Sequence, residues 1–183
     1  KLVELGQSAA GEFIVERFAS EPFEKGWITD GQIEKFDEVA DAVRRVVSKS
    51  GTRTKSVVMA MPQSAVITKK IMLPAGLREQ ELELQVETEA NQYIPFALEE
   101  VNLDFQVIGP APNSPDDVEV LIAASRKDKI EDRVAAAAAA DLKAVVMDID
   151  SFAAQAAFEL IERQLPEAGK DQSIAIINIG GAI

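Results

Sequence analysis

The sequence contains no cysteine and no histidine. Without cysteine, the chain cannot form disulfides, thiolate metal sites or a cysteine nucleophile. Without histidine, it lacks the commonest general base and the commonest zinc ligand of proteins. A Ser-His-Asp or Cys-His mechanism is therefore excluded within these 183 residues.

Basic residues are scarce relative to acidic ones. The chain has 19 lysines and arginines against 31 aspartates and glutamates, a net charge of −12. Because an acidic surface repels phosphate backbones, we expect no nucleic-acid partner. No apolar run approaches the roughly 20 residues of a membrane span, and no signal peptide opens the chain. These features predict a cytoplasmic protein without direct membrane insertion, attached to a membrane only through a protein partner.

Hydrophobic periodicity and turn residues predict an alternation of strands and helices. Strands are expected at residues 1–5, 12–19, 56–61, 65–73, 100–108, 118–125, 143–150 and 174–179. Helices are expected from Asp30 to about residue 50, over 78–94, over 126–141, and from Ser151 to about 163. Asp30 and Ser151 are the expected N-caps and Gly51 the C-terminal glycine, and residues 109–117 are expected to form a loop.

This order of elements predicts a mixed α/β fold. A plain doubly wound sheet would not begin with a hairpin and carry a second β-β-α-β-β segment inside it. We therefore expect an inserted subdomain, roughly over residues 61–141.

Two stretches have residue types suited to nucleotide chemistry. The strand in "VVMDIDSFA" delivers Asp148 and Asp150 to its C-terminal end, where open α/β sheets place ligands, and alternation puts both on one face. The other stretch, "IINIGG", runs from a strand into Gly180 and Gly181, whose amides could cradle a phosphate. Together they offer what a Mg²⁺-nucleotide requires. Each also has an ordinary interpretation, the first as a helix cap or solvated turn and the second as a simple turn.

A longer stretch, "SAVITKKIMLPAGLREQELELQVETEANQYIPFALEEVNLDFQVIGP", resembles the bacterial type IV pilus assembly protein family PilM. The shared features are the "SAVITK" strand, an acidic helix ending in "YIPF", and a following strand with the motif "LEEV-x-x-DF". "VEVLIAASRKDKIEDR" and "VVMDIDSFA" continue the similarity, which covers essentially the whole chain.

The resemblance implies the first half of an actin-like ATPase fold related to FtsA. Residues 1–60 and 142–172 would form the core subdomain, 61–141 the inserted subdomain, and 173–183 the start of the second half. "IAIINIGG" resembles the second phosphate loop, and the first would lie before Lys1. ATP and Mg²⁺ are implied for the full-length protein, whereas these residues alone are not expected to hold nucleotide.

The resemblance also implies ligand contacts. Asn178, Gly180 and Gly181 would bind the nucleotide, and Asp148 and Asp150 would hold Mg²⁺ through water. No catalytic residue is assigned. Asn178 stands where most relatives have aspartate and Asp150 where they have glutamate, so we expect binding, with at most weak hydrolysis.

The family binds the N-terminal cytoplasmic tail of the membrane protein PilN, and other pilus assembly proteins, at the inner membrane. Tyr93, Ile94, Pro95 and Phe96 are the candidate residues for this partner, lining a groove between the core and the insertion; alternatively, they plug a core. Other functions remain open: a catalytically active actin-like ATPase or kinase, an FtsA-like filament protein, or the cytoplasmic domain of a type II secretion protein.

Overall fold

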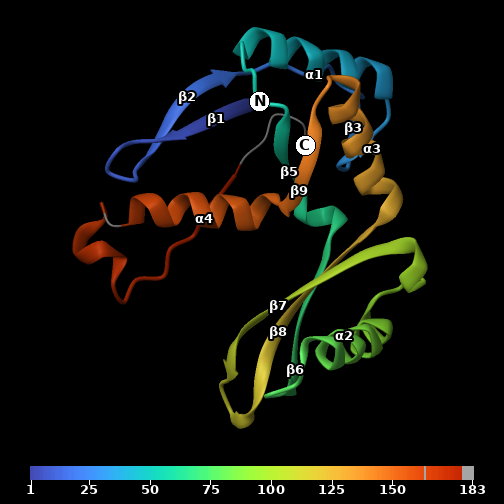
Figure 1. Cartoon of the computed structure of the whole chain (residues 1–183), viewed down its shortest axis with the longest axis vertical. Coiled ribbons are helices and arrows are strands. Elements are labelled where there is room, and N and C mark those ends of the chain that lie inside the picture. The colour runs from blue at the N-terminus through green and yellow to red at the C-terminus, as the bar shows by residue number, and fades with distance from the viewer. Residues whose placement is uncertain (163, 179–183) are drawn as a thin grey trace. The chain divides into compact units, whose positions relative to one another are not determined.

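The computed structural model describes residues 1–162 and 164–178 and divides into two compact units (Figure 1). Unit 1 comprises Lys1–Met61 together with the chain from Glu131 onward, and unit 2 comprises Pro62–Ile130. The boundary on the C-terminal side falls within helix α3 (Lys127–Ala139). Assigning these units to subdomains of an actin-like fold remains a prediction.

Unit 2 consists of a three-stranded antiparallel sheet and one helix. The strand order is β6 (Ile67–Pro74), β8 (Ser114–Arg126) and β7 (Val101–Ala111), so β8 is central. Helix α2 (Glu79–Tyr93) packs on one face of this sheet (Figure 1). Two short 3₁₀ segments, Gln63–Ala65 and Leu98–Glu100, precede β6 and β7.

The core of unit 2 follows from strand alternation. Side chains at every second position of each strand point to the face that α2 covers. The fully or nearly fully buried members are Ile71, Leu73, Val86, Ala90, Ile94, Val101, Val120, Ile122 and Ala124. The helix predicted over residues 78–94 is therefore confirmed, with Val86 and Ala90 of α2 and the following Ile94 in the core. The helix ends before Pro95, which disfavours helical geometry in the preceding residue.

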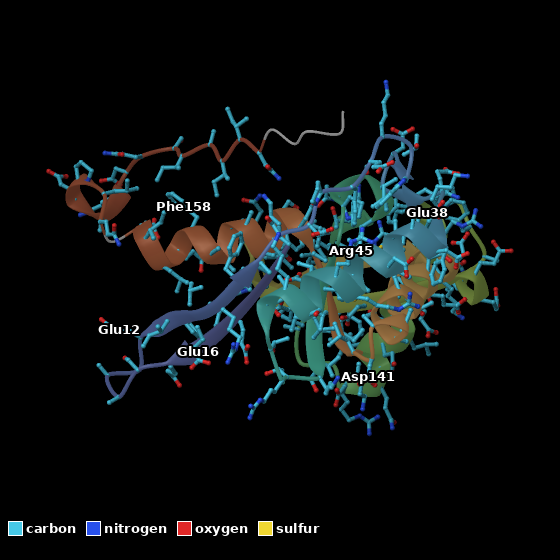
Figure 2. All side chains as sticks on the ribbon, turned by 90° about the horizontal axis from the view of Figure 1, so that it is seen from above. Glu12, Glu16, Glu38, Arg45, Asp141 and Phe158 are labelled. Carbon is cyan, nitrogen blue, oxygen red and sulfur yellow. The ribbon has the colours of Figure 1, made fainter. Side chains whose placement is uncertain are left out.

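In the described part of the chain, unit 1 contains three separate pairs of strands, one of them a short pair between residues 28 and 33. Strands β1 (Leu2–Gln7) and β2 (Phe13–Ala19) form an antiparallel hairpin, as predicted, and β5 (Ser56–Met61) pairs in parallel with β9 (Lys143–Ile149). In Figure 2 the turn of the hairpin, marked by Glu12, projects away from α1.

The helices of unit 1 are α1 (Phe36–Ser50), α4 (Asp150–Glu162) and most of α3, with a short 3₁₀ segment at Pro166–Gly169. Helix α1 buries Val39, Ala40, Ala42 and Val46. It ends at Ser50 and is capped by Gly51, whose φ of 66° confirms the predicted C-terminal glycine.

The predicted start of α1 at Asp30 was wrong. Asp30 and Gly31, with φ values of 49° and 73°, form the tight turn between β3 (Ile28–Thr29) and β4 (Gln32–Ile33). An Asp-Gly pair suits a two-residue hairpin turn because both residues tolerate positive φ. The helix therefore begins only at Phe36.

The predicted loop at residues 109–117 was also wrong. Strand β7 runs on to Ala111, which pairs with Ser114 at the start of β8, so the segment is a hairpin. Pro110 is tolerated there because β7 is an edge strand. A strand was predicted at residues 174–179, but residues 174–178 pair with no described strand and form no regular structure. Residue 179 lies outside the described residues.

Candidate functional site

The strand-end carboxylates sit on two successive elements. Asp148 lies opposite Ala60 near the C-terminal end of the parallel pair, partly buried, and its Oδ1 accepts a hydrogen bond from the Ile149 backbone N–H at 2.7 Å. Asp150 is exposed and is already the first residue of α4. Strand alternation therefore does not extend to Asp150, and Ser151 lies inside α4 rather than capping it, which corrects both expectations.

A water-mediated magnesium contact was predicted for Asp148 and Asp150. No group of three or more acidic side chains that could hold a metal occurs among the described residues. Magnesium commonly retains several waters and uses only one or two carboxylates together with substrate phosphates, so a pair is sufficient. The magnesium contact remains a prediction.

The predicted phosphate loop is only partly visible. Asn178 is exposed and lies in an irregular segment. Gly180 and Gly181 lie outside the described residues, so their predicted role in binding a nucleotide stays a prediction.

The stretch from Tyr93 to Phe96 forms a corner at the end of α2. Tyr93 is 45% exposed and Phe96 37% exposed, and Pro95 between them is exposed as well. Ile94 is only 7% exposed and belongs to the core of unit 2. The stretch is therefore divided, with Ile94 fixing the corner from inside while Tyr93, Pro95 and Phe96 reach solvent. Ile94 does not line a surface, contrary to the expectation for it.

Each of the two exposed rings carries a cation on its face. Lys69 Nζ lies 4.8 Å from the centroid of the Tyr93 ring, and Arg126 Cζ lies 5.5 Å from the centroid of the Phe96 ring. These distances fall within the roughly 6 Å range of cation–π attraction. Sequence reasoning missed both cations. A signal existed in β6, where Lys69 interrupts the apolar row of Ile67 and Ile71.

The two cations differ in how firmly they are held. Arg126 donates to Asp128 twice, from Nε at 3.1 Å and from a terminal nitrogen at 2.9 Å. Burial alone would raise the pKa of the Asp128 carboxyl, but hydrogen bonds from Arg126 and from the Lys129 backbone outweigh it and lower that pKa. Lys69, in contrast, pairs with no carboxylate in the part of the chain that the structure describes.

The fold and these features define a mixed α/β protein of the actin-like class, with a compact sheet-and-helix unit within the chain. The chain belongs to the type IV pilus assembly protein PilM family, whose model matches residues 1–183. It is also similar to a solved chain of a "PilM-PilN type IV pilus biogenesis complex", with a TM-score of 0.77 and 29% identity over 90% of this chain. The α/β, actin-like fold class predicted from the sequence is confirmed.

The present chain is shorter than that relative. The match covers 48% of the solved chain, so this chain spans about half of its length. Among residues 1–162 and 164–178, no helix is both long and apolar enough to cross a membrane.

Proposed function

We propose that this protein acts in type IV pilus assembly by binding the N-terminal cytoplasmic tail of PilN. The observation that carries the proposal is the similarity, over 90% of this chain, to a protein solved as a PilM–PilN complex. Binding, rather than turnover of a substrate, is the proposed activity. The absence of histidine and cysteine agrees with this, since most nucleophile–base pairs are unavailable.

The surface proposed to receive the tail includes Tyr93, Pro95 and Phe96. Exposed aromatic rings are favourable anchors because they bury a large apolar area while losing little conformational entropy. The net charge of −12 would steer a basic tail toward the protein. A peptide that combines apolar and basic residues fits both properties.

ATP with Mg²⁺ is proposed as a conformational ligand of the longer protein. Asp148 and Asp150 would contact the magnesium through water, and Asn178, Gly180 and Gly181 would contact the phosphates. Hydrolysis would be weak, because the amide of Asn178 cannot act as a base. In the longer protein, Asp150→Ala should weaken nucleotide binding more in Mg²⁺ than in EDTA. An equal loss in both buffers would instead indicate a structural role for Asp150 in α4.

The proposed location is the cytoplasmic side of the inner membrane. Attachment there would come through PilN and other pilus assembly proteins rather than through a segment of this chain. Nucleic acid is not a proposed partner, given the acid excess.

Calorimetric titration with a synthetic PilN tail peptide tests the central proposal. We expect saturable binding, and a loss of at least tenfold, about 1.4 kcal/mol, in Phe96→Ala. Met72→Ala is the matched control, since Met72 is 64% exposed and alternates with the core residues Ile71 and Leu73. Thermal melts must show that Phe96→Ala remains folded. Equal binding of a scrambled peptide would contradict the proposal.

A further inference from the structure

Lys69 on β6 is the cation that covers the Tyr93 ring at the end of α2. Lys69 lies on β6 between Ile67 and Ile71, two residues that pack with the core on the side facing α2. A lysine at such a position cannot stay in the apolar interior, so it extends its amine to the rim. There its Nζ lies 4.8 Å from the centroid of the exposed ring of Tyr93, the last residue of α2.

Lys69 is held only weakly at this place. Its amine makes no ion pair in the described part of the chain, and a cation–π contact at an exposed site is among the weaker interactions of a protein surface. Arg126 provides the contrast, since its double hydrogen bond to Asp128 holds it over Phe96. One ring is therefore covered by a loosely held cation and the other by a firmly held one.

The negative charge of unit 2 favours the binding of a positively charged side chain from a partner. Unit 2 has six basic and twelve acidic residues, so a positively charged side chain gains from approaching it. The electron-rich face of Tyr93 already holds an amine, which shows that the local geometry suits one. A lysine or arginine from a partner would compete with Lys69 for the same face.

We propose that the Tyr93 ring is the docking face for a lysine or arginine side chain of the partner tail, and that Lys69 is a resident cation which this side chain displaces. The inference rests on the proposed PilN binding. It assigns separate roles to the two pairs: Tyr93 and Lys69 exchange partners, whereas Phe96 and Arg126 stay together and shape the corner.

This proposal predicts that removing a positive charge strengthens binding. In Lys69→Gln the competitor for the ring and a like charge are both absent, so the tail peptide should bind about two- to fivefold more tightly. Lys69→Arg keeps the charge and the stacking and should bind like the wild type. Replacing the lysines and arginines of the peptide with glutamine should abolish the difference between wild type and Lys69→Gln.

Two further variants distinguish an effect of the Tyr93 ring on peptide binding from the general effect of removing a positive charge. Lys70→Gln removes the same charge one residue away, from a side chain that lies 3.3 Å from Glu119, and should not tighten binding. In the Tyr93→Leu background, Lys69→Gln should bring no gain. Because Tyr93 is the single tyrosine of the chain, 3-fluorotyrosine labels this site alone, and its ¹⁹F resonance should shift on addition of the peptide.

The titrations and the ¹⁹F spectra are to be recorded with the PilN tail peptide on variants whose thermal melts match the wild type. Weaker binding in Lys69→Gln, an equal gain in Lys70→Gln, or a gain that persists without Tyr93 would each overturn the exchange. Wild-type binding with an unmoved ¹⁹F resonance would do so as well, while leaving PilN binding intact. A complete absence of binding would overturn the proposed function, and this inference with it.

Discussion

The two units of the molecule differ in how they bury their apolar side chains. Unit 2 encloses a continuous core of branched residues between one helix and one face of a three-stranded sheet, and Val86 and Val120 are fully buried. The buried residues of unit 1 are mostly smaller, chiefly the alanines and valines of α1 and α3. Since stability grows with the apolar area removed from water, unit 2 has the better basis for folding by itself.

Unit 1 leaves large apolar side chains in water. One face of the β1–β2 hairpin presents Val3, Leu5, Phe13, Val15 and Phe18, which are 52%, 55%, 62%, 61% and 61% exposed. The parallel pair exposes Val58 and Val146 by 62% and 52%, although parallel sheets are normally covered on both faces. The two units therefore contain similar elements but differ in how much of their apolar surface they bury.

Separating the two units should have the largest effect. We expect residues 62–130 alone to give a cooperative urea transition, because their core is internal to the unit. Residues 1–61 joined by a short linker to 131–178 should bind a hydrophobic dye and melt without cooperativity. Circular dichroism and dye fluorescence would measure both. A cooperative unit 1 and an unfolded unit 2 would reverse the comparison.

A single core substitution in unit 2 should have the next largest effect. Ile122 is 3% exposed in the central strand, so Ile122→Ala should lower the free energy of unfolding by about 2–5 kcal/mol. The matched control is Ile108→Ala on β7, where the side chain is 48% exposed and should cost far less. Urea denaturation of both variants measures the difference. Equal losses would mean that the core is not where the structure has it.

Elements with a strong period were predictable from the sequence. The stripe of α2 and the alternation of β7 appear directly in the residue order because each is set by one buried face. Asp30 failed as an N-cap because aspartate before glycine serves a hairpin turn equally well. The hairpin around Ala111 was missed because glycine and proline, which normally signal loops, are also tolerated on an edge strand.

The candidate site was less predictable than the fold. The sequence indicated Tyr93 and Phe96 as candidate partner-binding residues but could not show whether their rings are buried in a core or exposed. That depends on how the end of α2 and the residues after it pack on the sheet. Lys69 and Arg126 are 24 and 30 residues from the rings that they cover, so only the tertiary packing of α2 on the sheet brings them together. The position of Asp148, Asp150, Gly180 and Gly181 at strand ends indicated a nucleotide site in the sequence, whereas Asn178 was indicated by the resemblance alone.

Substitution on the exposed hairpin face should change unit 1 little in stability. Phe18 is 61% exposed, so Phe18→Thr, which keeps strand propensity, should alter the free energy of unfolding by no more than about 0.5 kcal/mol. Self-association in sedimentation velocity should decrease, because an apolar side chain leaves the surface. Val46→Thr on α1 is the buried counterpart and should cost about 1–3 kcal/mol. A loss of that size in Phe18→Thr would show that something covers this face in solution.

The smallest effect concerns two glutamates whose pKa values are lowered for different reasons. In unit 1 the Thr54 hydroxyl, then that of Thr52, and the charge of Arg17 hold the pKa of Glu4 below its ordinary 4.5. Thr54 Oγ1 donates to Glu4 Oε1 at 2.8 Å, which ties β1 to the segment after α1. In unit 2 the Arg78 side chain, then its backbone N–H, lower the pKa of Glu81. That contact lies within the first turn of α2.

In both cases the folded protein favours the ionised carboxylate. The stabilisation is therefore complete above the ordinary pKa of 4.5 and is lost as the pH falls through the lowered value. Glu4→Gln should be less stable than wild type at pH 7, and the difference should vanish toward pH 3 in thermal melts of the whole chain. Glu81→Gln should show the same trend mainly as faster amide exchange at the start of α2, because its contacts are local. A Glu4→Gln difference that persists unchanged at low pH would show that the Thr54 and Arg17 contacts do not depend on the charge.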